Sequence, residues 1–171
     1  MKKYKEIQGW ISQGDLQWLY ETAQKMNSIV EIGCWKGKST YSLLYGCKGK
    51  VYAIDTFLGT PGDVEQKVFT DKEDILSIFM ENVGHFRNLD IMKGNSHSLV
   101  ITFPDKSLDM VFIDADHNYE MVKRDIELWL PKTKKLISGH DIQYSPTENA
   151  VRDALGEYQT TDDNIWYKEL S

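Results

Sequence analysis

The stretch Val30-Glu31-Ile32-Gly33-Cys34-Trp35-Lys36-Gly37-Lys38-Ser39-Thr40 decides the fold of this 171-residue chain. An apolar run that ends at Ile32 meets a turn with two glycines, and an amphipathic segment follows, so we expect a strand, a tight loop and a helix. Gly33 and Gly37 let the backbone bend sharply and approach a ligand closely, and the first helical turn presents free N–H groups. The stretch therefore predicts a ligand-binding loop.

Two classes of ligand use a loop of this kind. The segment Gly33 to Ser39 is one residue shorter than the phosphate-binding loop of nucleotide hydrolases, where four residues separate the first glycine from Gly-Lys-Ser/Thr. Two acidic residues favour an adenosine-type ligand without a triphosphate, because Glu31 ends the first predicted strand and Asp55 ends the second. These carboxylates would repel a triphosphate, and Asp55 has the place of a ribose-binding acid. A P-loop-like nucleotide hydrolase remains the alternative.

Several segments together resemble a known enzyme family. Residues 30–40, followed by Val51 to Asp55, resemble the first two motifs of class I S-adenosylmethionine-dependent methyltransferases. Leu108 to His117 and Ile137 to Asp141 resemble the branch of small, often metal-assisted O-methyltransferases of the caffeoyl-coenzyme A, catechol and macrolide-sugar kinds. The resemblance implies S-adenosylmethionine as cofactor, and its motifs assign the following cofactor-binding residues: Glu31, Gly33, Gly37, Ser39, Thr40, Asp55, Asn95, Ser96 and Asp114. In that family the turn at Asn95 and Ser96 reaches the adenine, whereas the simpler interpretation is a surface turn.

The order of apolar and amphipathic segments predicts an α/β fold with a single doubly wound, mostly parallel sheet flanked by helices, as in Rossmann-like methyltransferases. We expect residues 1–171 to form one domain, with 1–26 as a helical N-terminal extension that either packs on the domain or acts as a lid. A helix is predicted over 117–130, with Asp125 on its solvated face. Thr70 to Glu73 is predicted to cap a helix that ends near Val83.

Composition limits the partners of the chain. The net charge is -6 and the pI about 5.2, which gives no general attraction to nucleic acid or to anionic lipid. No apolar run reaches the roughly 20 residues that cross a bilayer, and Cys34 and Cys47 are predicted to be free thiols. We expect a cytoplasmic protein whose partner is a small-molecule acceptor, with no nucleic acid or membrane, and leave a homo-oligomer open.

Acidic and histidine side chains follow the fourth and fifth predicted strands. Because the ends of parallel strands meet at one edge of the sheet, we expect these five residues to form one cluster: Asp114, Asp116, His117, His140 and Asp141. A divalent cation on Asp114, His140 and Asp141 could orient the acceptor, with Mg²⁺, Mn²⁺ or Ca²⁺ as candidates. Alternatively, His140 or His117 acts as the general base, and we favour His140 because it adjoins Asp141.

These residues predict an S-adenosylmethionine-dependent methyltransferase that methylates a hydroxyl group on a small acceptor. Asp114 is assigned both to catalysis and to cofactor binding. Besides the nucleotide hydrolase, a non-catalytic module that binds the cofactor and has no working acceptor site stays open.

Overall fold

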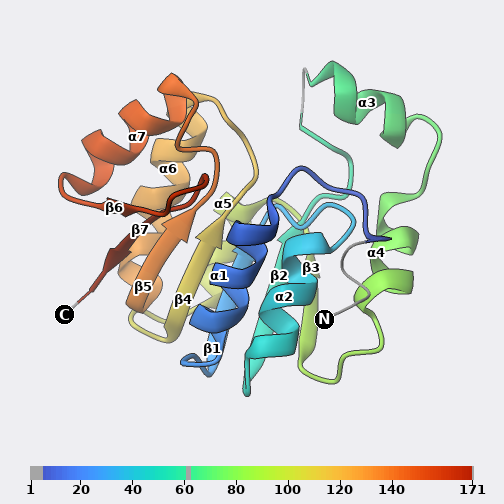
Figure 1. The fold of residues 1–171 in the computed structure, drawn as a ribbon, viewed down its shortest axis with the longest axis horizontal. Helices are drawn as coiled ribbons and strands as arrows, with labels where there is room; N and C mark the ends of the chain where they lie inside the picture. The colour runs from blue at the N-terminus through green and yellow to red at the C-terminus, as the bar shows by residue number, and fades with distance from the viewer. Residues whose placement is uncertain (1–5, 61–62, 171) are drawn as a thin grey trace.

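The computed structural model describes residues 6–60 and 63–170. In this part of the chain, seven strands form one sheet in the order β3-β2-β1-β4-β5-β7-β6 (Figure 1). Five strands are parallel: β1 (Ser28–Ile32), β2 (Lys50–Asp55), β3 (Leu89–Lys93), β4 (Leu108–Ile113) and β5 (Thr133–Gly139). An antiparallel pair, β7 (Trp166–Glu169) and β6 (Gln159–Thr160), continues the sheet beyond β5. The predicted mostly parallel sheet is confirmed.

Helices cover both faces of this sheet (Figure 1). One face carries α1 (Gln13–Ala23), α2 (Lys38–Gly46) and α4 (Ile75–Val83). The other carries α5 (Ser96–Leu99), α6 (Tyr119–Trp129) and α7 (Ser145–Leu155), with short 3₁₀ turns at Val100–Thr102 and Leu130–Lys132. The remaining helix, α3 (Val64–Thr70), has no buried residue and stands away from the sheet near the ends of the strands.

Two hydrophobic cores result, because successive residues of a strand point to opposite faces. Ile29 of β1 packs with Met110 and Phe112 of β4 under α1 and α2. Val30 and Val111 belong to the second core, under α6 and α7. All six residues of β4 are buried, as expected for a central parallel strand with helices on both sides.

Side chains cap the helices before β1 and β3, the second at a different residue from the one predicted. The Ser12 side chain accepts a hydrogen bond from the Asp15 N–H and caps α1. The predicted capping box at Thr70 is wrong, because Thr70 ends α3 and Asp74 caps α4 by accepting from the Ser77 N–H. Asp74, one residue after the predicted box, therefore satisfies one of the free N–H groups at the start of α4.

The order of the strands places a crevice beside β1. The chain runs from β1 outward to β3 and then returns to β4 on the other side of β1, so the loops after β1 and β4 leave the sheet in different directions. Ligands of open α/β sheets bind at such a switch point. Within 6–60 and 63–170, no helix has the length and apolar character to span a bilayer.

Candidate functional site

The glycine loop connects β1 to α2 and packs tightly against its neighbours. Gly33 has a φ of 83°, and a Cβ there would lie 2.0 Å from the backbone oxygen of Asp114. Gly37 caps α2 with a φ of 89°, and its Cβ would lie 3.2 Å from side-chain atoms of Phe79 and Val83. Both glycines are therefore needed for the fold itself. The prediction that a ligand requires them omitted this packing against β4 and α4.

Asp55 ties this loop to the end of β2. Its Oδ2 accepts hydrogen bonds from the backbone N–H groups of Cys34 and Trp35, at 2.7 and 2.8 Å, and its Oδ1 accepts from the N–H of Phe57 at 2.7 Å. Burial raises the pKa of Asp55 although these three N–H groups favour its ionised form. The carboxylate still lines a cavity, so it can accept further hydrogen bonds from a ligand.

Among the acidic and hydroxyl residues predicted around the loop, Asp55 lines one cavity and Ser39 lines a second one. Glu31 and Thr40 are completely buried behind the cavity wall. Burial raises the pKa of Glu31, and the nearby Ser39 and Thr40 hydroxyls offset only part of this rise, so that the pKa is about 7. Neither carboxylate oxygen of Glu31 has a hydrogen bond of normal geometry. Direct contact of Glu31 or Thr40 with a cofactor, which the sequence predicts, does not fit this arrangement.

Asn95 and Ser96 follow β3 and line the same cavity as Asp55. The Asn95 side chain caps the short α5 by accepting from the N–H of His97 at 2.9 Å. The Ser96 hydroxyl donates a hydrogen bond to Asp125 of α6 at 2.7 Å. The prediction that Asp125 lies on a solvated face is wrong, since the residue is 3% exposed and faces this cavity.

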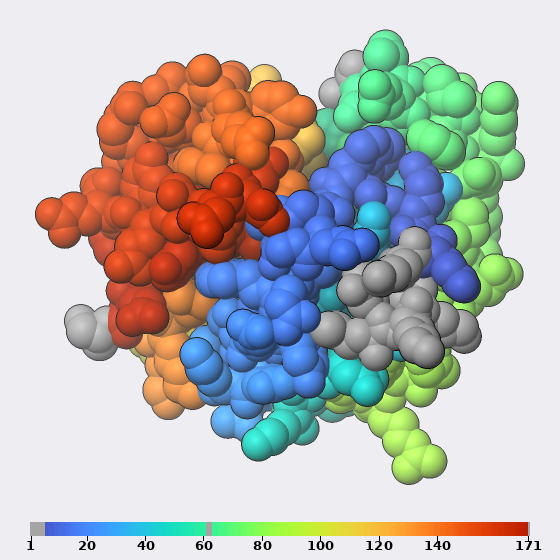
Figure 2. Space-filling model, in the orientation of Figure 1, coloured from blue at the N-terminus to red at the C-terminus, as the bar shows by residue number. Residues whose placement is uncertain are grey.

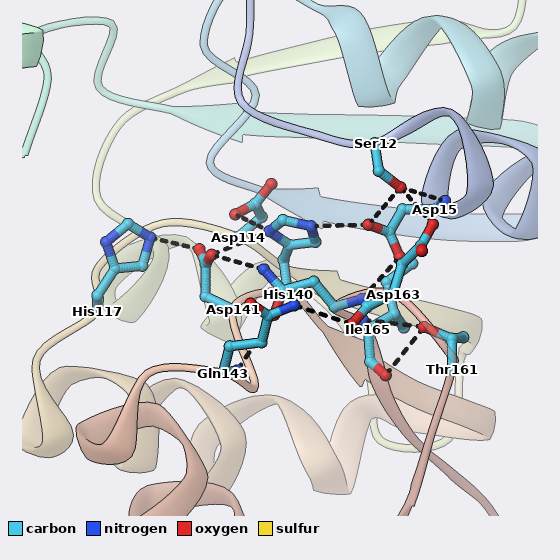
Figure 3. Close-up of polar contacts among 11 residues, drawn as sticks. Ser12, Asp15, Asp114, His117, His140, Asp141, Gln143, Thr161, Asp163 and Ile165 are labelled. Atoms are coloured by element: carbon cyan, nitrogen blue, oxygen red, sulfur yellow. Dashed lines mark hydrogen bonds and ion pairs between the residues drawn. The ribbon is translucent and has the colours of Figure 1, made fainter.

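The predicted acidic and histidine cluster forms at the ends of β4 and β5 (Figure 3). His117 Nε2 lies 2.6 Å from Asp141 Oδ2. His140 Nδ1 lies 3.3 Å from Asp141 Oδ1 and 3.8 Å from Asp114 Oδ1. Asp141 has a φ of 64°, which a residue with a side chain seldom adopts and which is common at functional sites. The Asp116 side chain accepts a hydrogen bond from the backbone N–H of Asn118, two residues further along the same loop.

His140 has a further partner that sequence reasoning missed. Its Nε2 lies 3.2 Å from Oδ2 of Asp15 on α1, and both side chains are buried. Burial alone would lower the pKa of His140, but the surrounding carboxylates of Asp114, Asp141 and Asp15 raise it to about 10. The proximity of Asp15 to Ser12 suggests only a helix cap in the sequence, so nothing indicated that this carboxylate reaches across to β5.

The two histidines consequently differ in access. The His117 side chain is 43% exposed, whereas the His140 side chain is 4% exposed and has carboxylates at both ring nitrogens. His117 lines a cavity together with Asp114 and Asp141. The preference for His140 as the general base does not fit this geometry, because a base must reach the proton that it removes.

The cluster also has donors that suit a cation. One ligand atom each from Asp114, His140 and Asp141 lie within 4.8 Å of one another. A histidine that offers Nδ1 to a metal while Asp15 holds its Nε2–H has the usual partner arrangement of a metal-binding imidazole. One nitrogen and two carboxylates suit Mn²⁺ or Zn²⁺ better than Mg²⁺ or Ca²⁺. The three residues therefore fit Mn²⁺ or Zn²⁺.

Two cavities meet at this edge of the sheet. The first extends over the ends of β2 and β3 and contains Asp55 and Ser96. The second contains Ser39 and His117 and is bordered by the segment before α1. The cavities share the following wall: Gly33, Trp35, Gln66, Asp114 and Ala115. A ligand that occupies the first cavity can therefore place one end next to a molecule in the second.

Aromatic side chains surround the mouth of the second cavity. Trp10 lies with its ring centroid 5.6 Å from that of Trp35 and 6.1 Å from that of Phe69. On the opposite side, Tyr144 stacks on His117 with the ring centroids 5.6 Å apart. Figure 2 shows the N-terminal residues, in blue, between the C-terminal part, in orange and red, and α3 and α4, in green. The segment before α1, rather than α1 itself, thus borders the cavity, while α1 packs on α2.

Comparison with known proteins identifies the family. A family model described as "Methyltransferase domain" matches residues 30–142, which is more than half of the chain. This chain belongs to that methyltransferase family. The match begins at β1 and ends just after β5, so it contains the glycine loop and the acidic and histidine cluster. The family match sets aside the nucleotide hydrolase. Lys38, the residue that would bind the phosphates in such an enzyme, instead donates a hydrogen bond to the backbone oxygen of Gly9 at 2.9 Å.

Individual relatives agree with the family at the level of the fold. An O-methyltransferase from Bacillus cereus, solved with SAH, has a TM-score of 0.67 and 17% identity, with 95% of this methyltransferase chain and 83% of that chain covered. The O-methyltransferase TomG from Streptomyces achromogenes, solved with SAM, has a TM-score of 0.62 and 12% identity, and the match covers 92% of this chain and 80% of TomG. An uncharacterized protein from Sinorhizobium fredii, y4gI, is 25% identical over 142 residues, which are 78% of this chain and 15% of that protein. This chain thus spans about 15% of that curated relative's length.

Proposed function

We propose that this methyltransferase transfers the methyl group of S-adenosylmethionine to a hydroxyl group of a small acceptor molecule. The observation that carries the proposal is the meeting of two cavities at Asp114, with Asp55 in the first and His117 in the second. Two structural relatives were solved with SAH and with SAM, which agrees with this cofactor. We take residues 1–171 as one domain with 1–26 as its N-terminal extension, in which the residues just before α1 border the acceptor.

In this proposal the first cavity holds the nucleoside and the second holds the methionine end and the acceptor. The Asp55 carboxylate accepts hydrogen bonds from the ribose hydroxyls, because two oxygens of one carboxylate suit a diol. Ser39 and Asp114 border the second cavity, where a hydroxyl and a carboxylate can bind the carboxylate and ammonium groups of methionine. The sulfonium methyl group then points toward the acceptor beside His117.

His117 is the proposed general base. Its Nε2–H donates to Asp141, which leaves Nδ1 with a lone pair for the acceptor proton. The acceptor oxygen attacks the methyl carbon in line with the carbon–sulfur bond, that bond breaks, and S-adenosylhomocysteine leaves as His117 takes the proton. The Asp141 carboxylate orients the imidazole and stabilises its charged form, as the aspartate of a catalytic triad does for its histidine.

A divalent ion would be held by Asp114, His140 and Asp141. When bound, such an ion would polarise the acceptor hydroxyl and lower its pKa. The buried Asp15 then serves as the second partner of His140 and keeps its Nδ1 directed at Asp114 and Asp141.

Binding and turnover measurements test the proposal. Calorimetry should detect S-adenosylhomocysteine binding and no ATP binding, and a panel of small hydroxylated acceptors should include one that is methylated. His117→Ala should lower that rate about 100-fold to 10,000-fold while cofactor affinity stays within about threefold. Cofactor binding without turnover of any acceptor would instead favour a non-catalytic binding module, and absence of cofactor binding would refute the proposal.

A further inference from the structure

A buried carboxylate that has no part in the chemistry proposed above lines the first cavity. Asp125 lies in the middle of α6 and is 3% exposed, and its Oδ1 accepts the hydroxyl proton of Ser96 at 2.7 Å. Ser96 follows β3, so the hydrogen bond joins two segments that both line the cavity. A buried carboxylate on a cavity wall needs a reason, because burial of an ionised group costs free energy unless partners stabilise it.

A second side chain supports Asp125 in the same place. His97 Nε2 lies 3.2 Å from the same Oδ1, and the His97 side chain is 11% exposed. Ser96 and His97 are neighbours on the short helix α5, which packs against α6. Of these two neighbours, Ser96 makes the hydrogen bond to the carboxylate, whereas His97 Nε2 lies close to it without a hydrogen bond of normal geometry.

The direction of the Ser96 hydrogen bond determines what the cavity can recognise. A serine hydroxyl has one proton and two lone pairs, and here the proton is committed to Asp125. Ser96 Oγ can therefore only accept hydrogen bonds from a molecule in the cavity, and an ionised Asp125 can likewise only accept. This part of the cavity wall therefore favours a ligand group that donates a hydrogen bond, such as an amine, and disfavours a carbonyl oxygen, which can only accept one.

We infer that Asp125 is a positioning residue that makes the Ser96 corner selective for a 6-amino purine over a 6-oxo purine. The inference rests on the proposed function, in which the first cavity holds the cofactor nucleoside. The exocyclic amine of adenine can donate to Ser96, whereas the 6-oxo group of hypoxanthine would face its lone pairs without a proton between them. Such an unpaired contact is a strong source of discrimination in buried sites.

The test uses calorimetry to compare S-adenosylhomocysteine with S-inosylhomocysteine, which differ at purine position 6 and in the proton on the neighbouring N1. The unmodified protein should bind the adenosyl compound about 10-fold to 100-fold more tightly. In Asp125→Ala the Ser96 hydroxyl is free to turn and donate to the 6-oxo group, so the ratio of affinities should fall at least about threefold from that of the unmodified protein. The N1 difference between the two ligands is the same for both proteins and cancels in this comparison. Asp125→Asn, whose amide oxygen can still accept the Ser96 proton, should restore most of the ratio.

A mutant cycle and a control separate this role from a general effect on the cavity. Ser96→Ala should also lower the ratio, and adding Asp125→Ala to it should change the ratio no further, because Asp125 acts through Ser96. Glu127→Ala, which removes an exposed carboxylate from the same helix, should keep the original ratio.

Each outcome bears on a separate claim. A normal ratio in Asp125→Ala would overturn the inference, and so would a normal ratio in Ser96→Ala, which can be measured even where the Asp125 variant does not fold. If the unmodified protein binds both compounds equally, Asp125 confers no selectivity and the inference is also wrong. If it binds neither, the failure belongs to the proposed function.

Discussion

The buried carboxylate of Glu31 should make the protein less stable as the pH rises, and Glu31→Gln should remove that loss. Burial without a normal hydrogen bond raises the pKa of Glu31 from its ordinary value of 4.5 to about 7. The folded state therefore binds a proton more tightly than the unfolded state, so this residue lowers stability as the pH rises from about 4.5 to about 7. Each tenfold change in proton affinity is worth about 1.4 kcal/mol, which gives a loss of roughly 3 kcal/mol.

Urea unfolding of the ligand-free protein at pH 5 and pH 8 measures this effect. At pH 5 both side chains are neutral in the folded state, so Glu31→Gln should change the unfolding free energy mainly through its shape and hydrogen bonding. At pH 8 the variant should gain roughly 2.5 kcal/mol relative to that value, because only the unmodified protein then carries the buried charge and slightly less than 1 kcal/mol of the full loss is already present at pH 5. Glu127→Gln, on the exposed face of α6, serves as the control and should show no difference between the two conditions. A gain below about 1 kcal/mol, or a loss, would refute the reasoning.

Further substitutions test the loop and the cluster. Asp55→Ala should weaken S-adenosylhomocysteine binding by about 2 kcal/mol, since a charged acceptor is lost, and unchanged affinity in calorimetry would remove it from the ribose site. Gly33→Ala should lower the melting temperature far more than Gly156→Ala, because both have positive φ but only the first would place a Cβ 2.0 Å from the Asp114 backbone oxygen. Equal shifts would mean that the loop relaxes. If a metal assists the reaction, a chelator should stop turnover and added Mn²⁺ should restore it, whereas indifference to the chelator would leave His117 to act alone.

Much of the fold follows from local sequence. The apolar runs that end at Ile32, Asp55 and Asp114 are separated by amphipathic segments, and this order is enough to predict a mostly parallel sheet with helices on both faces. The helix α3 was not predicted, because its seven residues bury no side chain and so carry no periodic apolar signal. Its place near the cavity mouth results from the chain path between β2 and β3.

The candidate site was predictable where residues follow a strand directly. Asp55, His117 and Asp141 meet the cavities as expected from the ends of parallel strands. Asp125 was misplaced because charge suggested solvent, although its spacing from Val122 and Trp129 puts it on the buried side of α6. No pattern in the sequence could have paired Asp15 with His140, because local spacing holds no information on a contact between two distant elements.

That contact has a consequence for how the protein is made. Asp15 and His140 are 125 positions apart, and His140 follows the fifth strand. During synthesis, α1 leaves the ribosome long before the residue that neutralises its buried carboxylate exists, so α1 cannot reach its final environment until translation has passed β5. Contacts between such distant residues form slowly, because the intervening loop must first be closed. The acceptor side of the site, held by the same histidine, is therefore completed among the last steps of folding. A nascent chain that stops before His140 has the glycine loop and His117 but lacks the Asp141 carboxylate that orients this histidine.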